Sequence, residues 1–179
     1  MHDLVITEDF WRSYLNFCGE IDMFSRFNKE KSGTVLYCAA IQSVMYPLLM
    51  HKIGINFNKD AVLLIDKNEF GRKVGDLDSI HRFKEQGIFS DVIDYDIFSV
   101  RKEAEENPKN HYIEYFDRMF HQCGYQIEKF DEIYVLNDSW DNDINLYFNF
   151  KGIEYTWINL LKNYIPVPST NLKWRNELM

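Results

Sequence analysis

The chain has 179 residues, 16% of them aromatic, and a formal net charge of −8. A chain of this length can bury roughly 70% of its unfolded surface, so one domain can form without disulfides or a structural metal. The acidic balance argues against nucleic acid and anionic membrane surfaces as partners, because both require clustered Lys and Arg.

The first half of the chain is predicted to begin with a helix over residues 7–28, where apolar residues recur every three or four positions. Residues 34–39 are rich in β-forming residues and apolar on both faces, which is typical of a central parallel strand. An amphipathic helix over residues 41–49 follows, and Pro47 is expected to kink it. Residues 61–65 form another apolar run and are predicted to be a second buried strand.

The second half continues this alternation of amphipathic segments and short apolar runs. The predicted helices are residues 77–86, the segment with its apolar face from Tyr112 to Cys123, and residues 141–150. The predicted strands are residues 91–95, 132–137 and 154–158. Alternating strands and helices with short connections predict a parallel sheet with right-handed crossovers.

The predicted fold is therefore a Rossmann-like three-layer α/β sandwich with a mostly parallel sheet, preceded by an N-terminal helix. We assign residues 1–165 to this single domain. Residues 166–179 contain Pro166 and Pro168, which favour an extended path, and are predicted to form a C-terminal tail.

The cysteines and the first residues of the chain bear on where in the cell the protein is expected. The three cysteines form no CxxC pair, and Cys38 and Cys123 are interpreted as reduced residues of the core. The start MHDLVITEDFW has no basic segment followed by a long apolar run, and no stretch approaches eighteen consecutive apolar residues. We expect a cytoplasmic protein with no transmembrane segment.

Ligands of parallel α/β sheets bind at the carboxyl ends of the strands, so polar residues there are candidate contacts. After the first strand, small alanines let a ligand approach the backbone, and the next helix N-terminus offers N–H groups. Carboxylates after later strands can bind sugar hydroxyls, and an exposed indole can stack on a sugar ring. The candidate substrate contacts are Gln42, Ser43, Asp66, Asp138 and Trp140. The alternative of ordinary turns stays open, because Asp, Asn and Ser also hydrogen-bond their own backbone.

Motifs of several enzyme classes are missing from the sequence. It contains no GxSxG, GxGxxG, GxxxxGK[ST] or HExxH. His111, Glu114, Asp117 and His121 can share one helix face, which we interpret as solvated because metal ligands must converge on one point. No cofactor and no metal are predicted, and no catalytic residue is assigned.

The run VLYCAAIQSVMYPLLMHKI followed by DAVLLID resembles the start of the bacterial sialyltransferases and polysialyltransferases of two-lobed GT-B fold. The resemblance covers residues 34–159, since EIYVLNDSW and INLYFNFKGIEYTWI are similar to later parts of the same lobe. It places Gln42 at the family's turn glutamine. Two departures stand out. Residues 157–160 hold no carboxylate where the family has an acid-acid-Gly motif, and the His-Pro motif of the donor lobe is missing.

The resemblance implies the acceptor-side lobe of a glycosyltransferase of surface polysaccharide synthesis, such as capsule synthesis, truncated or inactive alone. Its partners would be a carbohydrate acceptor and, with a second lobe, a nucleotide sugar. One alternative is a non-enzymatic module that binds a partner protein or forms a homodimer through the first helix and the tail with Trp174. Another is a small independent enzyme acting on a phosphorylated or nucleotide substrate through the helix N-terminus after Ala40.

Overall fold

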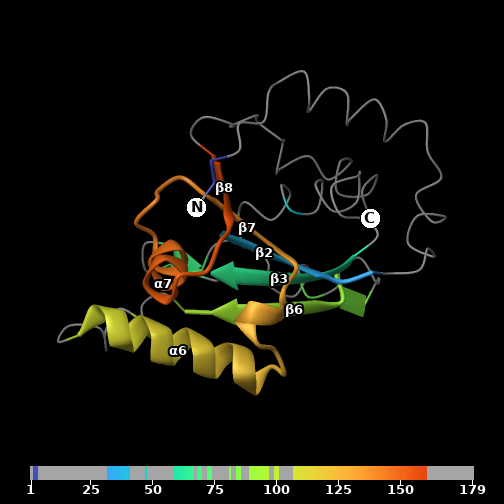
Figure 1. Ribbon diagram of the computed structural model, residues 1–179, viewed down its shortest axis with the longest axis horizontal. Coiled ribbons are helices and arrows are strands. Elements are labelled where there is room, and N and C mark those ends of the chain that lie inside the picture. The colour runs from blue at the N-terminus through green and yellow to red at the C-terminus, as the bar shows by residue number, and fades with distance from the viewer. Residues whose placement is uncertain are drawn as a thin grey trace.

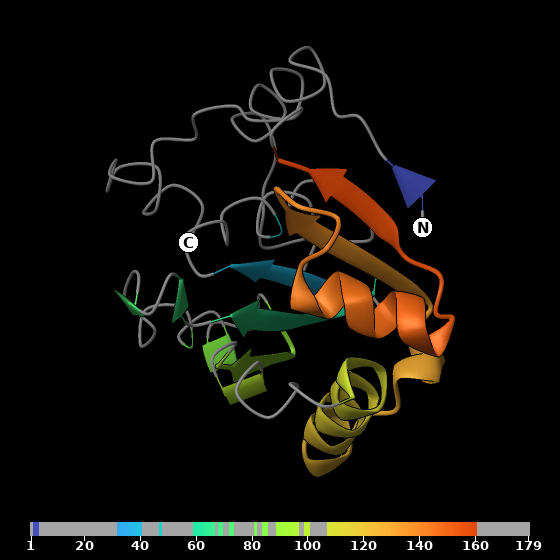
Figure 2. The same ribbon diagram turned by 90° about the vertical axis from the view of Figure 1, so that its left-hand side faces the viewer.

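The computed structural model contains a six-stranded sheet in which every pair of neighbouring strands is parallel (Figures 1 and 2). The structure describes residues 2–3, 32–40, 47, 59–66, 68–69, 72–73, 81, 84–85, 89–96, 99–100 and 107–160. The predicted Rossmann-like α/β fold is therefore confirmed.

The strands lie in the order β1-β8-β7-β2-β3-β6 across the sheet. They span His2–Asp3 (β1), Thr34–Ala40 (β2), Asp60–Asp66 (β3), Asp91–Tyr95 (β6), Glu132–Asn137 (β7) and Thr156–Asn159 (β8). A separate antiparallel pair joins Asn68–Glu69 (β4) and Arg72–Lys73 (β5).

The order of the strands reverses at the centre of the sheet. From β2 the chain adds β3 and then β6 on one side, and afterwards adds β7 and then β8 on the other side. In β2 and β3 five consecutive residues are buried, because these strands have neighbours on both sides and are covered on both faces. The reversal leaves a topological switch point between β2 and β7, which is where such sheets usually bind ligands.

Two helices cover one face of the sheet (Figures 1 and 2). Helix α6, Pro108–Gln122, begins with a proline after the capping residue Asn107, whose side chain accepts a hydrogen bond from the N–H of Asn110. Helix α7, Asp143–Lys151, ends at Gly152, whose left-handed φ of 73° suits a residue without a Cβ. A short 3-10 helix, η2, spans Ile127–Lys129 between α6 and β7.

A charged cluster ties these three helical elements together. The Lys151 ammonium bonds the carboxylates of Asp117 on α6 and Glu128 on η2, and the Tyr147 hydroxyl donates to Asp117. Burial opposes the charge of Lys151, but the two carboxylates outweigh it and raise the lysine's pKa. The hydrogen bond from Lys151 lowers the pKa of Glu128. The cluster therefore holds α6 and α7 in a fixed relation.

A second clamp holds the amino end of β6. Asp91 accepts hydrogen bonds from Lys84 at 3.1 Å and from the Tyr125 hydroxyl at 2.9 Å. Partial burial acts to raise the pKa of Asp91, but these hydrogen bonds outweigh it and lower that pKa. The ionised carboxylate therefore joins the edge strand to the segment that follows α6.

A hydrogen bond that passes beside a glycine joins the amino ends of β2 and β7. Asp131 accepts a hydrogen bond from the Thr34 N–H at 2.6 Å. Gly33 lies beside this contact with a φ of 90°, and a Cβ built on it would come within 2.2 Å of the Asp131 carboxylate. The close approach and the left-handed backbone both require glycine here.

The opposite face of the sheet is buried as well. Tyr37 of β2 is fully buried, stacks on Tyr134 with ring centroids 5.5 Å apart, and meets Phe89 edge-on. The helical layer predicted for that face lies outside the described residues.

Most predicted elements within the described ranges are confirmed. The first four strands agree within one residue at each end, whereas the fifth begins at Thr156 rather than Glu154. Helix α6 begins at Pro108 and is capped by Asn107, so it starts before the apolar face from which the helix was predicted. One prediction is wrong, since Cys123 is exposed beyond the end of α6 and does not join the core.

Other predictions are only partly covered. The helix over residues 7–28 and the tail over 166–179 lie outside the described residues. Pro47 is helical and buried, and His81, Lys84 and Glu85 are helical, while the rest of their predicted helices lies outside the described ranges. In the part of the chain that the structure describes, no helix is both long enough and apolar enough to cross a membrane.

Candidate functional site

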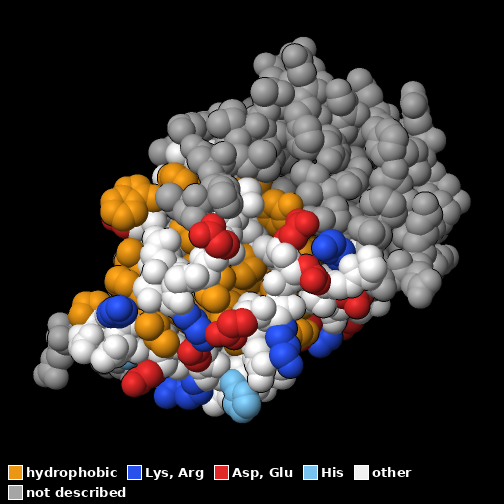
Figure 3. Space-filling view, viewed as in Figure 1, with side chains coloured by type: hydrophobic (Ala, Val, Ile, Leu, Met, Phe, Trp, Pro, Cys, Tyr) orange, Lys and Arg blue, Asp and Glu red, His pale blue; other side chains and the backbone are white. Residues whose placement is uncertain are grey.

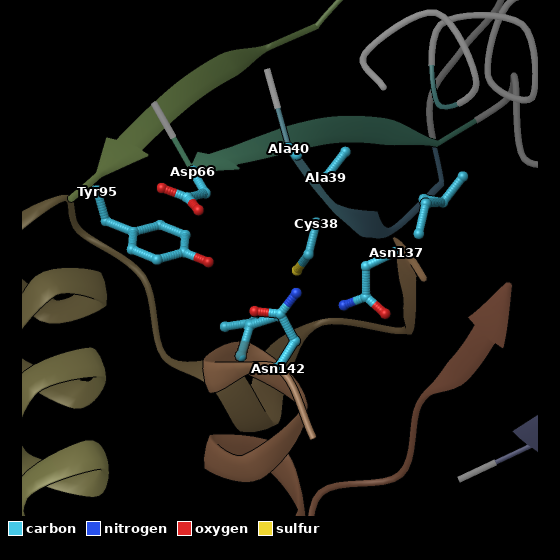
Figure 4. A pocket seen from close by; sticks show the side chains of 9 residues that line it. Cys38, Ala39, Ala40, Asp66, Tyr95, Asn137 and Asn142 are labelled. Carbon is cyan, nitrogen blue, oxygen red and sulfur yellow. The ribbon is translucent and has the colours of Figure 1, made fainter. Parts of the chain in front are cut away.

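A hollow lies at the carboxyl ends of β2, β3, β6 and β7 and thus at the switch point of the sheet (Figure 4). Its volume is about 280 Å³, including the part open to solvent. Small, apolar and polar side chains share its wall. The lining residues are Cys38, Ala39, Ala40, Asp66, Tyr95, Leu136, Asn137, Asn142 and Ile144.

The register of the strands brings the lining residues together. Ala40 pairs with Asp66 across β2 and β3, and Asp66 pairs with Tyr95 across β3 and β6. On the other side of β2, Ala39 pairs with Leu136. The three residues Ala40, Asp66 and Tyr95 therefore form one row, and the small Ala40 keeps the row open beside the carboxylate.

Tyr95 is the most unusual group in this wall. Its side chain is only 6% exposed and its ring meets Phe116 edge-on at 5.2 Å. Figure 4 shows its hydroxyl directed towards the middle of the lining residues. No hydrogen-bond partner for that hydroxyl is present among the described residues. Burial, and then the negative charge of Asp66, raise its pKa well above the usual value, so the phenol stays protonated and can donate.

Asn137 contributes an amide whose orientation is determined by its neighbours. The indole N–H of Trp157, which can only donate, bonds Asn137 Oδ1 at 2.9 Å. The Nδ2 group of Asn137 must then face the other way, where it donates to Asn145 Oδ1 at 2.6 Å. An amide nitrogen carries two hydrogens, so one of them remains after this bond.

Asn142 presents its amide from the start of α7. Its Oδ1 accepts a hydrogen bond from the N–H of Asp143 at 3.0 Å and caps the helix. The Nδ2 end of this side chain is therefore the half that can turn to a ligand. Donors from Asn142 and Asn137 thus face the carboxylate of Asp66 across the hollow (Figure 4).

A second carboxylate lies close behind the wall. Asp143 is 1% exposed, is the first residue of α7, and accepts a hydrogen bond from the Tyr112 hydroxyl at 2.5 Å. Together with Asp66 it acts to raise the pKa of Tyr95.

Cys38 lines the hollow but lacks the environment of a nucleophile. The residue is 2% exposed, and burial raises the pKa of its thiol. Reactive cysteines have lowered pKa values beside cations or helix N-termini. We therefore treat Cys38 as part of the wall.

The hollow includes one of the residues selected from the sequence, Asp66. Asp138 is exposed and Trp140 is 59% exposed, both in the turn between β7 and α7, and neither lines the hollow. Gln42 and Ser43 lie outside the described residues. Whether any of these residues binds a substrate stays a prediction.

Sequence reasoning missed Tyr95, Asn137 and Asn142. The selection favoured polar residues that come after a predicted strand. Asp66, Tyr95 and Asn137 are instead the last residues of the strands β3, β6 and β7 themselves. The position at a strand's end was a usable signal. The unpartnered state of the Tyr95 hydroxyl is visible only in the structure.

The polar residues of α6 have local structural roles. The His111 ring bonds the carbonyl of Val100 at 2.9 Å, and Asp117 belongs to the cluster around Lys151, so the predicted solvated face is only partly exposed. Charged groups of both signs are interspersed over the described face around α6 (Figure 3). Across the described ranges, no three His, Cys, Asp or Glu side chains gather closely enough to hold a metal ion.

The comparisons with known proteins add no relative. No family model, curated protein or solved structure matches the chain.

Proposed function

We propose that the chain is the acceptor-side lobe of a GT-B-like glycosyltransferase of surface polysaccharide synthesis, and that the hollow at the carboxyl ends of β2, β3, β6 and β7 binds a hydroxyl-bearing edge of an acceptor sugar. The observation that carries this proposal is the pairing of Asp66 and Tyr95 on neighbouring strands. A carboxylate and an unpartnered, protonated hydroxyl meet there at one hollow.

The chemistry of the lining suits a polyol. A carboxylate has two oxygens and accepts hydrogen bonds from two neighbouring hydroxyls, as acids at strand ends do with ribose in dinucleotide-binding folds. Tyr95 can donate to and accept from a third hydroxyl, while Asn142 and Asn137 supply donors on the opposite side. Ala39, Leu136 and Ile144 offer apolar contact for the C–H face of a ring.

The space enclosed by the wall is small. The figure of about 280 Å³ includes open solvent, and a water-sized group can be centred in only about 30 Å³ of it. The hollow is therefore a better match for one hydroxyl-bearing edge of a sugar ring than for a complete nucleotide sugar. In this proposal the nucleotide-sugar donor would need a second lobe.

Titration of the chain with lactose and related galactosides and glucosides, followed by calorimetry and by ligand-observed NMR, tests the proposal. Asp66→Asn and Tyr95→Phe are expected to weaken binding about tenfold or more, since hydrogen bonds to charged groups contribute about 1.5–3 kcal/mol. Asp60→Asn is the matched control, because Asp60 is the exposed first residue of the same strand at the opposite edge of the sheet. Equal weakening by Asp60→Asn, or no sugar binding at all, would contradict the proposal.

The alternative of a non-enzymatic interaction module stays a prediction. Its expected contact surfaces, the first helix and the tail with Trp174, lie outside the described residues.

A further inference from the structure

We infer that the hollow binds the N-acetyl group of its acceptor sugar. The side-chain amides of Asn137 and Asn142 donate hydrogen bonds to the carbonyl oxygen of that group, and apolar side chains of the same wall pack against its methyl. This inference rests on the proposed function and names the class of acceptor, an N-acetylated amino sugar. The acetamido group enters beside a hydroxyl on the same edge of the sugar ring.

The orientation of the two amides is the first argument. The indole N–H of Trp157, which can only donate, bonds the oxygen of Asn137, and the nitrogen of that amide donates one of its two hydrogens to Asn145. The backbone N–H of Asp143 likewise bonds the oxygen of Asn142. Both nitrogens must therefore point away from these donors, and Figure 4 shows them on the sides of the two amides that face each other. The wall thus offers a ligand N–H donors from two directions.

A carbonyl oxygen is the acceptor that suits two converging donors. It has two lone pairs in one plane and no hydrogen of its own, so it can accept from both amides at once.

The apolar part of the wall favours an acetyl group over other acceptors. A carboxylate or phosphate would lose its water on entering apolar surroundings, which costs far more than the entry of a neutral amide. A methyl group, by contrast, gains from leaving water there. Five of the lining residues supply this apolar surface, namely Cys38, Ala39, Ala40, Leu136 and Ile144.

The size of the space agrees with an acetyl group. The region in which a water-sized group can be centred is about 30 Å³. The oxygen, carbon and methyl of an acetyl group are joined by bonds of about 1.2–1.5 Å, so their centres can share this region, whereas a whole sugar ring exceeds it. The ring then lies at the open mouth of the hollow with its acetamido substituent inside.

A matched pair of sugars tests the inference on the full chain. N-acetylgalactosamine and galactose differ only at the second ring carbon, which bears an acetamido group in one and a hydroxyl in the other. In calorimetry and ligand-observed NMR, we expect N-acetylgalactosamine to bind at least about tenfold more tightly, because it bonds both amides and buries a methyl group. Equal affinities, or a preference for galactose, overturn the inference and leave the proposed sugar site intact.

Two substitutions of Asn142 remove its N–H donor and keep the cap of α7. Asn142→Asp and Asn142→Ser both retain an oxygen of a good capping residue, and the serine adds no charge. We expect each to reduce the preference for N-acetylgalactosamine to about threefold or less, since one donor to the carbonyl is lost. Asn149→Asp is the matched control, because Asn149 is an exposed amide near the other end of α7. A preference that survives both Asn142 substitutions, or that falls equally in Asn149→Asp, overturns the inference.

If neither sugar binds, N-methylacetamide decides, because it carries the same amide without a ring. Its titration is followed by the side-chain NH2 signals of Asn137 and Asn142 in NMR spectra, with the signal of Asn149 as the reference. Shifts confined to the first two signals support the acetyl site, and the proposed sugar ligand alone then fails. Signals that stay unchanged overturn the inference together with the proposed function.

Discussion

Replacing Asn137 with alanine is predicted to lower the free energy of unfolding by about 2 kcal/mol or more. The substitution removes both partners of a buried chain: the acceptor of the Trp157 indole N–H and the donor to Asn145, which is fully buried. Each buried group left unpaired costs about 1–3 kcal/mol, so two groups give about 2–6 kcal/mol. We expect the lower end, because the adjoining hollow can admit water to the vacated space.

Urea unfolding followed by circular dichroism measures this loss, which corresponds to a fall in melting temperature of about 4–8 °C for a chain of this size. Asn149→Ala is the control, since Asn149 is exposed and its side-chain oxygen accepts a long 3.3 Å bond from the Tyr155 hydroxyl. In a double-mutant cycle, Trp157→Phe removes the orphaned N–H and should recover about 1 kcal/mol of the loss. A loss below about 0.5 kcal/mol, or strictly additive effects, would refute the reasoning.

Two further predictions concern the amino edge of the sheet. Gly33→Ala should destabilise the protein by more than Gly124→Ala, as measured by thermal unfolding. Both glycines have a positive φ, but of the two only Gly33 would bring its new Cβ against Asp131. Equal losses of stability in the two variants would contradict this. Asp91→Asn should lower stability at neutral pH, measured by urea unfolding across a pH series. Because the folded pKa of Asp91 is lowered, its contribution is present above the unfolded pKa of about 3.9 and is lost as pH falls through the folded value, so the gap to wild type should close below about pH 4. A gap of the same size at pH 7 and pH 2.5 would count against the ion pair.

The central strands could be predicted because their signal is local. β2 and β3 are continuous apolar runs, and such runs occur in strands that are buried on both faces. The two-residue strand β1 could not be predicted, because so short a segment has no periodicity and becomes a strand only by pairing with β8. The pairing of β2 with β7 is likewise a long-range choice that no local pattern encodes.

For the candidate site, the sequence indicates at which strand end a residue lies but not in which direction its side chain points. Asp66 could be predicted because it ends an unmistakable strand. Asp138 and Trp140 follow β7 equally closely, yet the turn that contains them, where Ser139 bonds Asp141, leaves both exposed outside the hollow. Tyr95 is as deeply buried as a core residue, so its aromatic character gave no reason to separate it from the core.

The strand reversal at β2 also has a consequence for how the molecule folds. The contact of Thr34 with Asp131, where β2 and β7 begin, joins residues 97 positions apart. The pairing of β2 with β3 spans roughly a quarter of that distance, so closing the chain onto β7 costs about 1 kcal/mol more in loop entropy. Pairings distant in sequence are the slow step in folding parallel sheets. The hollow therefore takes shape late, after β2 and β3 have paired, and during synthesis it cannot exist until residues beyond Asn142 have left the ribosome.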